Sequence, residues 1–179
     1  MAVVVQEMID GQASGVTFTV NPGTRYEDEI LITSVFGLGE GLVSGTLDSD
    51  QFIALKKPGY PIHERQLADK VEKLVFDTEK NVGTVTVAVD AEEAKKSSLT
   101  DNQIQAVAAV CHKIECAYKG VPQDIEWTID KEGTIRILQA RPITTIDAPI
   151  PAERGYSTIW DNSNIVESYS GVTTPLTFS

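Results

Sequence analysis

The sequence predicts an α+β fold in which a mainly antiparallel sheet packs with helices. Three observations carry this prediction. The first quarter of the chain is rich in β-branched residues interrupted by turns, residues 101–118 carry the stripe of an amphipathic helix, and two alternating segments at 124–140 are joined by a tight turn. With 179 residues, the chain is expected to form one domain with a tail.

Strands are expected from the first residues onward. Residues 3–8 form a short apolar run suited to a buried strand, and residues 11–14 are expected to turn. Residues 15–20 alternate as a second strand, which the Asn-Pro-Gly sequence at 21–23 ends, and residues 29–36 form a third. Because a strand pattern begins at once, we expect the chain to start inside a larger fold.

The middle of the chain gives a mixed pattern. Glycines break the strand pattern at 37–41, residues 50–55 suit a short strand, and residues 56–59 suit a turn. Residues 62–77 fit either a helical stripe or two short strands, and the pattern leaves both open. Residues 83–89 alternate cleanly and are predicted to form a strand.

The clearest helix is expected at 101–118. Thr100 and Gln103 have the spacing of a capping box, in which each side chain bonds the other residue's backbone amide. Gly120 and Pro122 are expected to end the helix. One stripe of this helix is apolar and consists of Ile104, Val107, Ala108, Cys111, Ile114 and Tyr118.

The two alternating segments after the helix are expected to form a hairpin. Pairing Asp130 with Gly133 at the turn places Glu126 opposite Ile137. The apolar face of the hairpin is then expected to pack on the helix. The opposite face is expected to carry Asp124, Glu126, Ile137, Gln139 and Arg141.

That polar face combines two carboxylates, one amide and one guanidinium. Carboxylate and amide oxygens are hard ligands that suit Mg²⁺ shared with substrate phosphates, and Arg141 can grip a phosphate with its planar fork. The combination suits a metal-nucleotide site for phosphoryl transfer, where positioning and charge neutralisation dominate. A solvated sheet face with cross-strand ion pairs is the alternative, and spacing alone favours it.

Two further candidate features carry less weight. The Gly-Leu-Gly-Glu-Gly segment at 37–41 would let a backbone approach a ligand closely, but no Gly-Lys-Ser/Thr follows it, and a plain turn explains it more simply. His63 and His112 have no neighbours at metal-ligand spacing and are expected to be ordinary surface histidines.

Charge and composition exclude several classes of protein. A net charge of −11 argues against a nucleic-acid partner, because phosphate backbones bind basic surfaces. No apolar run approaches the roughly 20 residues that a membrane span needs. Cys111 and Cys116 lie on one expected helix without facing each other and are expected to stay reduced, which suits a cytoplasmic protein.

Four motifs in a fixed order add a resemblance to a known family. They are VQEMI at 5–9, SGVTFTVNP at 14–22, FGLGEGLVSG at 36–45, and DIEW at 124–127 with LQARP at 138–142. Together they span about residues 3–145 and resemble the nucleotide-binding domain of phosphoenolpyruvate synthase and pyruvate phosphate dikinase, an ATP-grasp fold. With this resemblance, we interpret the polar face of the hairpin as a metal-nucleotide site and not as a solvated sheet face.

The resemblance implies an ATP site in the first part of the chain. Gln6 to Ile9 is similar to the strand that lines the adenine pocket, with backbone groups of Glu7, Met8 and Ile9 reading the base edge. Glu40 is similar to the acidic residue of the family's glycine-rich segment, near the nucleotide.

The resemblance also implies roles for the hairpin. Asp124, Glu126 and Gln139 are the implied metal-binding residues, with Glu126 and Gln139 as Mg²⁺ ligands and Asp124 beside them, and Arg141 looks like a phosphate contact at the transfer site. ATP and Mg²⁺ are therefore the expected cofactors. The implied reaction converts ATP, pyruvate and water to phosphoenolpyruvate, AMP and phosphate through a phosphohistidine in another domain.

The chain also departs from the family pattern. It resembles only the C-terminal half of the ATP-grasp domain, at 1–146, followed at 147–179 by a linker and the start of a truncated region. The expected partners are the N-terminal half, which supplies a lysine and an arginine to the phosphates, and the phosphohistidine domain. Without them we expect an inactive fragment that exposes apolar surface and self-associates.

Two other functions stay open. Residues 160–179 resemble the region that follows the ATP domain in rifampicin phosphotransferases, so the chain could belong to an enzyme of that kind, although a plain linker explains these residues equally well. A non-catalytic nucleotide-binding module is the other alternative. Such a module need not keep four polar side chains on the hairpin, and this chain has them.

Overall fold

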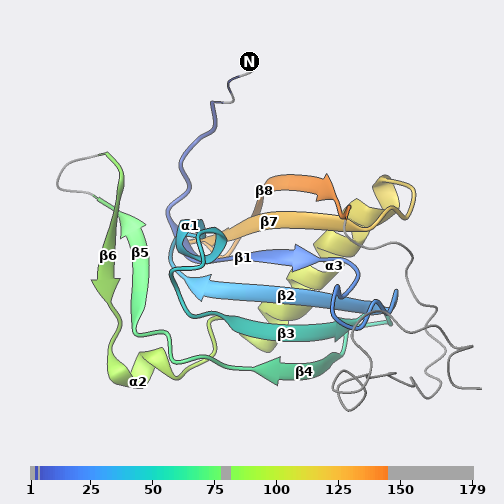
Figure 1. Cartoon of the computed structure of the whole chain (residues 1–179), viewed down its shortest axis with the longest axis horizontal. Coiled ribbons are helices and arrows are strands. Elements are labelled where there is room, and N and C mark those ends of the chain that lie inside the picture. The colour runs from blue at the N-terminus through green and yellow to red at the C-terminus, as the bar shows by residue number, and fades with distance from the viewer. Residues whose placement is uncertain (1–2, 4, 78–81, 145–179) are drawn as a thin grey trace, which may run out of the picture.

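The structure is a computed structural model that describes residue 3 and residues 5–77 and 82–144 (Figure 1). These residues form two antiparallel sheets with three helices, which confirms the predicted α+β class. The linker and following region predicted at 147–179 lie outside the described residues. None of the described helices is long and apolar enough to cross a membrane.

The larger sheet has six strands in the order β4-β3-β2-β1-β7-β8, and every neighbouring pair is antiparallel. The strands predicted at 29–36 and 50–55 are confirmed. The central pair, β1 and β7, joins the first part of the chain to the last described part. The bounds of the six strands are β1 (Gly11–Phe18), β2 (Glu29–Phe36), β3 (Asp50–Leu55), β4 (Ile62–Gln66), β7 (Gln123–Asp130) and β8 (Ile135–Pro142).

The smaller sheet pairs β5 (Glu72–Phe76) with β6 (Thr84–Ala88), followed by the short helix α2 (Ala91–Ala94). It stands at one end of the larger sheet, beside the short helix α1 (Glu40–Val43) (Figure 1). The ambiguous segment 62–77 is thus two strands, β4 and β5, in different sheets. Val85 and Val87 are 42% and 40% exposed, so β6 carries apolar surface. Self-association through such surface stays a prediction.

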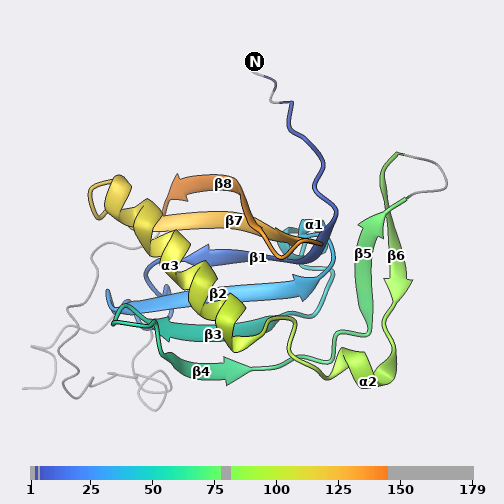
Figure 2. The same ribbon diagram turned by 180° about the vertical axis from the view of Figure 1, so that it is seen from behind.

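Helix α3 (Asp101–Ala117) crosses one face of the six-stranded sheet (Figure 2). The predicted capping box is present at Thr100 and Gln103. The buried core lies between the helix and the sheet and includes Ile104, Val107, Ala108 and Cys111 from α3 with Phe52, Ile125, Trp127 and Ile129 from the strands. Burial of each large apolar side chain contributes about 1.5–3 kcal/mol, so this contact supplies much of the stability.

The buried thiol of Cys111 is part of this core. Burial raises its pKa to about 12, so the thiol stays protonated at neutral pH. Cys111 and Cys116 are both free, and Cys116 is exposed, in agreement with two reduced cysteines that do not pair.

The first described residues do not form the predicted buried strand. Val5 is 94% exposed and Met8 58% exposed, and residues 5–10 are assigned to no strand. Both edges of β1 are occupied, by β2 and β7, so the β-branched run finds no strand edge there. The turn predicted at 11–14 is also wrong, because β1 begins at Gly11. A side chain at that position would collide with the Thr128 hydroxyl, which explains the glycine.

The register predicted for the β7–β8 hairpin is wrong by two residues in the part that carries the polar side chains. The hairpin loop has three residues rather than two, because the Asp130 amide donates to the Thr134 carbonyl 3.0 Å away, which shifts the register by one. A bulge shifts it by one more, since Trp127 pairs with Ile137 while Glu126 pairs with Gln139. Together the two shifts move β8 by two residues relative to β7, so Gln139 and Arg141 still lie on the predicted face of the hairpin.

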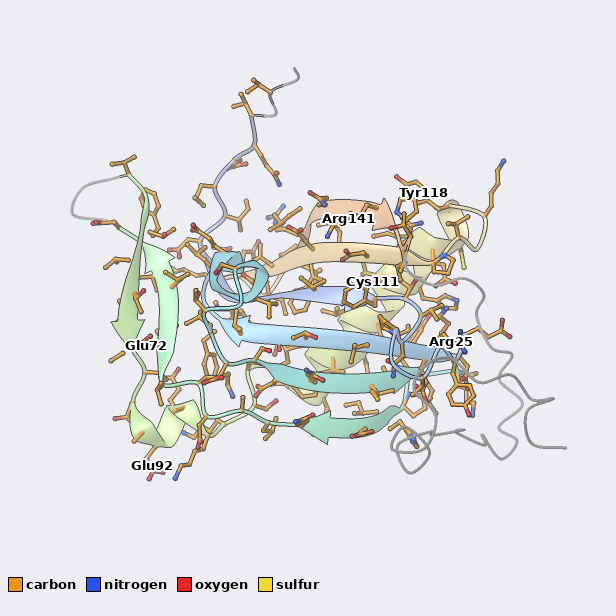
Figure 3. All side chains as sticks on the ribbon, viewed as in Figure 1. Arg25, Glu72, Glu92, Cys111, Tyr118 and Arg141 are labelled. Atoms are coloured by element: carbon orange, nitrogen blue, oxygen red, sulfur yellow. The ribbon has the colours of Figure 1, made fainter. Side chains whose placement is uncertain are left out.

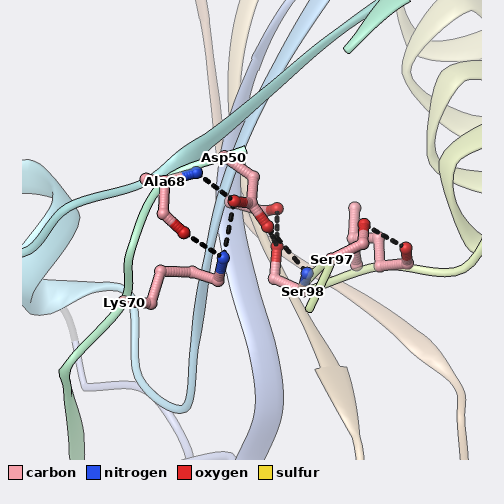
Figure 4. Close-up of polar contacts among 7 residues, drawn as sticks. Asp50, Ala68, Lys70, Ser97 and Ser98 are labelled. Carbon is pink, nitrogen blue, oxygen red and sulfur yellow. Dashed lines mark hydrogen bonds and ion pairs between the residues drawn. The ribbon is translucent and has the colours of Figure 1, made fainter. Parts of the chain in front are cut away.

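A buried ion pair ties the two sheets together. The Lys70 ammonium lies 2.6 Å from Asp50 Oδ1, and the two side chains are 1% and 0% exposed (Figure 4). Asp50 also accepts from the Ala68 amide and from the amide and hydroxyl of Ser98. Lys70 otherwise donates to the Ala68 carbonyl and lies over the Phe36 ring. One carboxylate therefore joins β3, the entry to β5 and the entry to α3.

Removing this carboxylate should be costly. We expect Asp50→Ala to lower the free energy of unfolding by about 3–5 kcal/mol, because it leaves a buried ammonium with one carbonyl partner. Lys70→Met should cost less, because Asp50 keeps three donors. Urea unfolding measures both. Arg65→Ala, which breaks the exposed pair between Arg65 and Asp101, is the control and should change the unfolding midpoint far less. Equal costs for Asp50→Ala and Arg65→Ala would contradict the role of burial.

Candidate functional site

A cavity of about 620 Å³ lies on the sheet face opposite α3. Its floor is formed by side chains that alternate with the core residues of β1 and β7, among them Ser14, Val16, Glu126 and Thr128. Its walls come from residues 6–9 and from the glycine-rich segment with the start of α1. Segments far apart in the sequence therefore meet in one hollow.

The structure brings most of the predicted site residues into this cavity. The lining includes seven of them, namely Gln6, Glu7, Met8, Ile9, Glu40, Glu126 and Gln139. Asp124 and Arg141 do not line it. They form the next same-face pair along the β7–β8 hairpin, directly beyond Glu126 and Gln139. Ile137, predicted on this face, instead pairs with Trp127, whose side chain belongs to the core on the α3 side.

Glu126 and Gln139 face each other across the two strands at the cavity floor. Glu126 is half-buried and Gln139 is exposed, and neither side chain makes a hydrogen bond to another described residue. Their oxygens are hard donors held next to one another and left available. This donor set fits Mg²⁺, which is usually bound by one or two protein oxygens together with water and phosphate.

No group of three or more His, Cys, Asp or Glu side chains suited to hold a metal occurs among the described residues. Of the two histidines, His63 is exposed, and His112 lies 3.0 Å from the Tyr60 hydroxyl. The exposed position of His63 agrees with the expectation of an ordinary surface histidine, whereas His112 is half-buried against Tyr60.

Asp124 and Arg141 form an ion pair. Arg141 Nε and Nη2 each lie 2.8 Å from Asp124 Oδ2. Figure 3 shows Arg141 on the β7–β8 side of the sheet. The hydrogen bond from Arg141 to Asp124 raises the pKa of the guanidinium, and the charges of Asp124 and Glu126 raise it further. Asp124 Oδ1 is buried and has no hydrogen-bond partner among the described residues.

The glycine-rich segment is fixed at Gly37 from two sides. The Gly37 amide donates to the Gln12 carbonyl at 3.0 Å, and its carbonyl accepts from the buried Ser14 hydroxyl at 2.6 Å. The next amide, of Leu38, donates to the Leu74 carbonyl of β5 at 2.8 Å. Gly37 has a positive φ of 73°, and a side chain there would collide with the Leu74 carbonyl oxygen.

Glu40 follows this segment and bonds to a residue that the sequence did not single out. The Thr84 hydroxyl, from β6, donates to Glu40 Oε2 at 3.1 Å, and both residues line the cavity. No local signal marks Thr84, because it comes from the second sheet. Ser14 was also missed as a site residue, although it begins the motif at 14–22.

Residues 6–9 run along the cavity without belonging to a strand. Among the described residues, the backbone groups of Glu7, Met8 and Ile9 make no hydrogen bond to another backbone group. Backbone groups of this kind need partners, so this stretch can offer both donors and acceptors to a bound molecule.

Comparison with known proteins shows the family to which the chain is related. Residues 1–154 match the family described as the pyruvate phosphate dikinase AMP/ATP-binding domain. The phosphoenolpyruvate synthase of Pyrococcus furiosus is 42% identical over 158 residues, which cover 86% of this chain and 19% of that protein.

Two relatives carry other names. The rifampicin phosphotransferase of Bacillus subtilis is 40% identical over 84% of this chain and 16% of its own length. The prodigiosin synthesizing transferase of Serratia marcescens is 38% identical over 93% of this chain and 18% of its own length. The chain thus spans less than a fifth of each of these relatives.

The fixed position of Gly37 leads to a stability prediction. Gly37→Ala and Gly45→Ala both place alanine at a positive φ, which costs about 1–2 kcal/mol. Only Gly37 also has a backbone carbonyl in the way, whereas Gly45 faces open space. We therefore expect Gly37→Ala to lower the free energy of unfolding clearly more than Gly45→Ala, as measured by urea unfolding. Equal losses would show that the Gly37 contact with β5 is not tight.

Proposed function

The chain belongs to the pyruvate phosphate dikinase AMP/ATP-binding domain family, and on that premise we propose that it holds ATP and Mg²⁺ for a phosphoenolpyruvate synthase-like phosphotransferase. The observation that carries the proposal is the cavity in which residues 6–9, the glycine-rich segment and the Glu126–Gln139 pair meet. A mononucleotide needs an apolar place for its base and a polar place for its phosphates, and this cavity offers both.

The base would lie against residues 6–9. Met8, Ile9 and Leu38 give this part of the cavity an apolar lining. The unused backbone groups of Glu7 to Ile9 would read the hydrogen-bonding edge of adenine, because backbone donors and acceptors alternate along an extended chain. Such an arrangement selects adenine through the main chain and leaves the exposed side chains of this segment free.

The phosphates would lie between the glycine-rich segment and the hairpin. Gly39 lines the cavity and allows close approach of the backbone, and Glu126 and Gln139 lie on the floor opposite. The cavity is lined by three carboxylates, those of Glu7, Glu40 and Glu126, and Asp124 already pairs with the Arg141 guanidinium beside it, so a triphosphate would be repelled without a cation. Mg²⁺ bound by Glu126 and Gln139 would supply this positive charge and bridge the phosphate oxygens.

Arg141 would complete the phosphate end. Its guanidinium is well exposed, lies one same-face position beyond Gln139, and keeps donors that Asp124 does not use. In phosphoryl transfer the protein contributes mainly position and charge stabilisation. We assign binding of the metal-nucleotide to the cavity and stabilisation of the transferring phosphate to Arg141.

The proposed overall reaction turns ATP, pyruvate and water into phosphoenolpyruvate, AMP and phosphate by way of a phosphohistidine in another domain. Residues 1–146 would form the C-terminal half of an ATP-grasp domain, with a linker and a further region at 147–179. The other half of the domain would supply the remaining phosphate contacts. Because identity to the rifampicin phosphotransferase is nearly as high, rifampicin is the alternative acceptor.

The metal assignment can be tested through nucleotide binding. We expect Glu126→Gln to weaken binding of ATP in the presence of Mg²⁺ by at least about tenfold, because a charged ligand is lost. In EDTA the variant should bind ATP no more weakly than the original chain, since a negative charge has been removed. Isothermal titration calorimetry measures both. Glu132→Gln, an exposed residue of the hairpin loop, is the control and should change neither. Unchanged binding with Mg²⁺ in Glu126→Gln would refute the metal site.

The need for a second half predicts the activity of the purified chain. We expect no pyruvate-dependent release of phosphate from ATP, because the other half and the phosphohistidine are supplied elsewhere. The phosphoenolpyruvate synthase of Pyrococcus furiosus serves as the positive control in the same assay. Robust pyruvate-dependent turnover by the chain alone would overturn the division of labour that we propose.

A further inference from the structure

We propose that Asp124 is a positioning residue for Arg141 and not a metal ligand. Its carboxylate holds one edge of the guanidinium, so that the other edge is presented to a phosphate and Glu126 stays free for the metal. This inference rests on the proposed function, because a nucleotide phosphate is what the free edge of Arg141 would bind.

The geometry of the ion pair divides the guanidinium into two edges. Nε and Nη2 both lie 2.8 Å from the same oxygen, Asp124 Oδ2. The Nη1 donors and the outer donor of Nη2 remain unused by this contact, and they form the kind of fork that matches two phosphate oxygens. Fixing the inner edge therefore fixes the direction of the outer edge.

Burial shows which partner is the anchor. The Asp124 side chain is 11% exposed, whereas the Arg141 side chain is 61% exposed. Asp124 Oδ1 has no hydrogen-bond partner among the described residues, so departure of Arg141 would leave a buried carboxylate with neither oxygen paired. An unpaired buried charge costs far more than an unpaired exposed guanidinium. Asp124 thus holds Arg141 more strongly than an exposed carboxylate would.

The same geometry argues against Asp124 as a metal ligand. One of its oxygens is taken by Arg141, the other is buried, and the residue does not line the cavity. Glu126 and Gln139, by contrast, line the cavity with free oxygens. Asp124 lies two residues from Glu126 along β7, which is roughly 7 Å. It is therefore placed to serve the arginine and not the metal pair.

Asp124 would also keep Arg141 away from Glu126. The Glu126 carboxylate already acts on the Arg141 charge, and it lies on the same sheet face. Without Asp124, this attraction would draw the guanidinium onto Glu126, where it would occupy the metal-binding oxygens. One buried carboxylate thus keeps two functional groups apart.

The two possible roles of Asp124, metal ligand and positioning residue, predict opposite changes in ATP affinity when its charge is removed. Asp124→Asn removes a negative charge, so as a metal ligand or a plain repulsive charge its loss should leave ATP affinity in EDTA unchanged or higher. As a positioning residue, its loss should lower that affinity, by roughly tenfold. Adenosine, which has no phosphate, should bind as before. Calorimetry measures both ligands with the full chain.

The hairpin offers a matched control. Asp130 is also buried and also holds an exposed arginine, with Arg136 Nε 2.8 Å from Asp130 Oδ2, but at the other end of the hairpin. Asp130→Asn should leave ATP affinity unchanged. Asp124→Glu, which keeps the charge, should recover part of the loss. In an Arg141→Gln background, Asp124→Asn should cause no further loss of ATP affinity, because the two residues act as one unit.

Two further measurements complete the test: the affinity for a metal ion, and the state of the ion pair in the protein without nucleotide. With Mn²⁺ as the probe, Asp124→Asn should bind the ion as the original chain does, while Glu126→Gln should not. A loss of Mn²⁺ affinity in Asp124→Asn equal to that in Glu126→Gln, with ATP affinity in EDTA undiminished, would overturn the proposal.

The Arg141 Nε–H signal in nitrogen-15 NMR reports the ion pair without nucleotide and should shift in Asp124→Asn. If the original chain bound no ATP while this signal shifted, the proposed function would fail and the ion pair would stand.

Discussion

The pairing of β1 with β7 is the contact on which the rest of the structure depends. It joins residues more than a hundred positions apart, and the floor of the cavity straddles it. Two close approaches hold it together. Gly15 lies where any side chain would strike the Trp127 ring, and Trp127 Nε1 donates to the Thr17 hydroxyl at 2.8 Å. On the opposite face of the same strands, the Ser14 and Thr128 hydroxyls lie within hydrogen-bond distance, at 2.9 Å. One face of the β1–β7 pair therefore contributes to the core, and the other face forms the floor of the cavity.

The second sheet supports the site from outside. Its strand β5 receives a hydrogen bond from the glycine-rich segment, and its strand β6 supplies the hydroxyl that bonds Glu40. The buried pair of Lys70 with Asp50 fixes the point where the chain enters β5. The glycine-rich segment is thus held between two sheets rather than hanging as a free loop, which limits the entropy that a bound ligand would have to remove.

Charge has a different use in each part of this protein. Asp50 and Lys70 neutralise each other out of water and serve the fold. Asp124 and Arg141 form a pair with one buried and one exposed partner, an arrangement that can aim a guanidinium. Glu126 makes no hydrogen bond to another described residue and so remains available to a cation. In an acidic chain with a net charge of −11, a polyphosphate ligand would need such a cation to approach.

The sequence by itself determined the features that depend on neighbouring residues. The alternation of 29–36, the capping box of α3 and the hairpin after it follow from contacts within a few positions, and all three are present. The common face of Asp124, Glu126, Gln139 and Arg141 was also predicted. The four side chains share that face in the structure as well, although the predicted register is wrong. The longer loop and the bulge each shift β8 by one residue relative to β7, and because side chains alternate between the two faces, a shift of two residues returns each side chain to the predicted face. The family followed from ordered motifs.

The tertiary structure decided everything that depends on which strand edges are free. Residues 3–8 have strand-forming composition, but both edges of β1 are taken, and no local pattern reveals this. The same holds for the division of 62–77 between two sheets, for Thr84 beside Glu40, and for the contact of Asp124 with Arg141. The physical reason is that side-chain alternation and capping are set by the local backbone, whereas pairing partners and burial are set by segments far away in the chain.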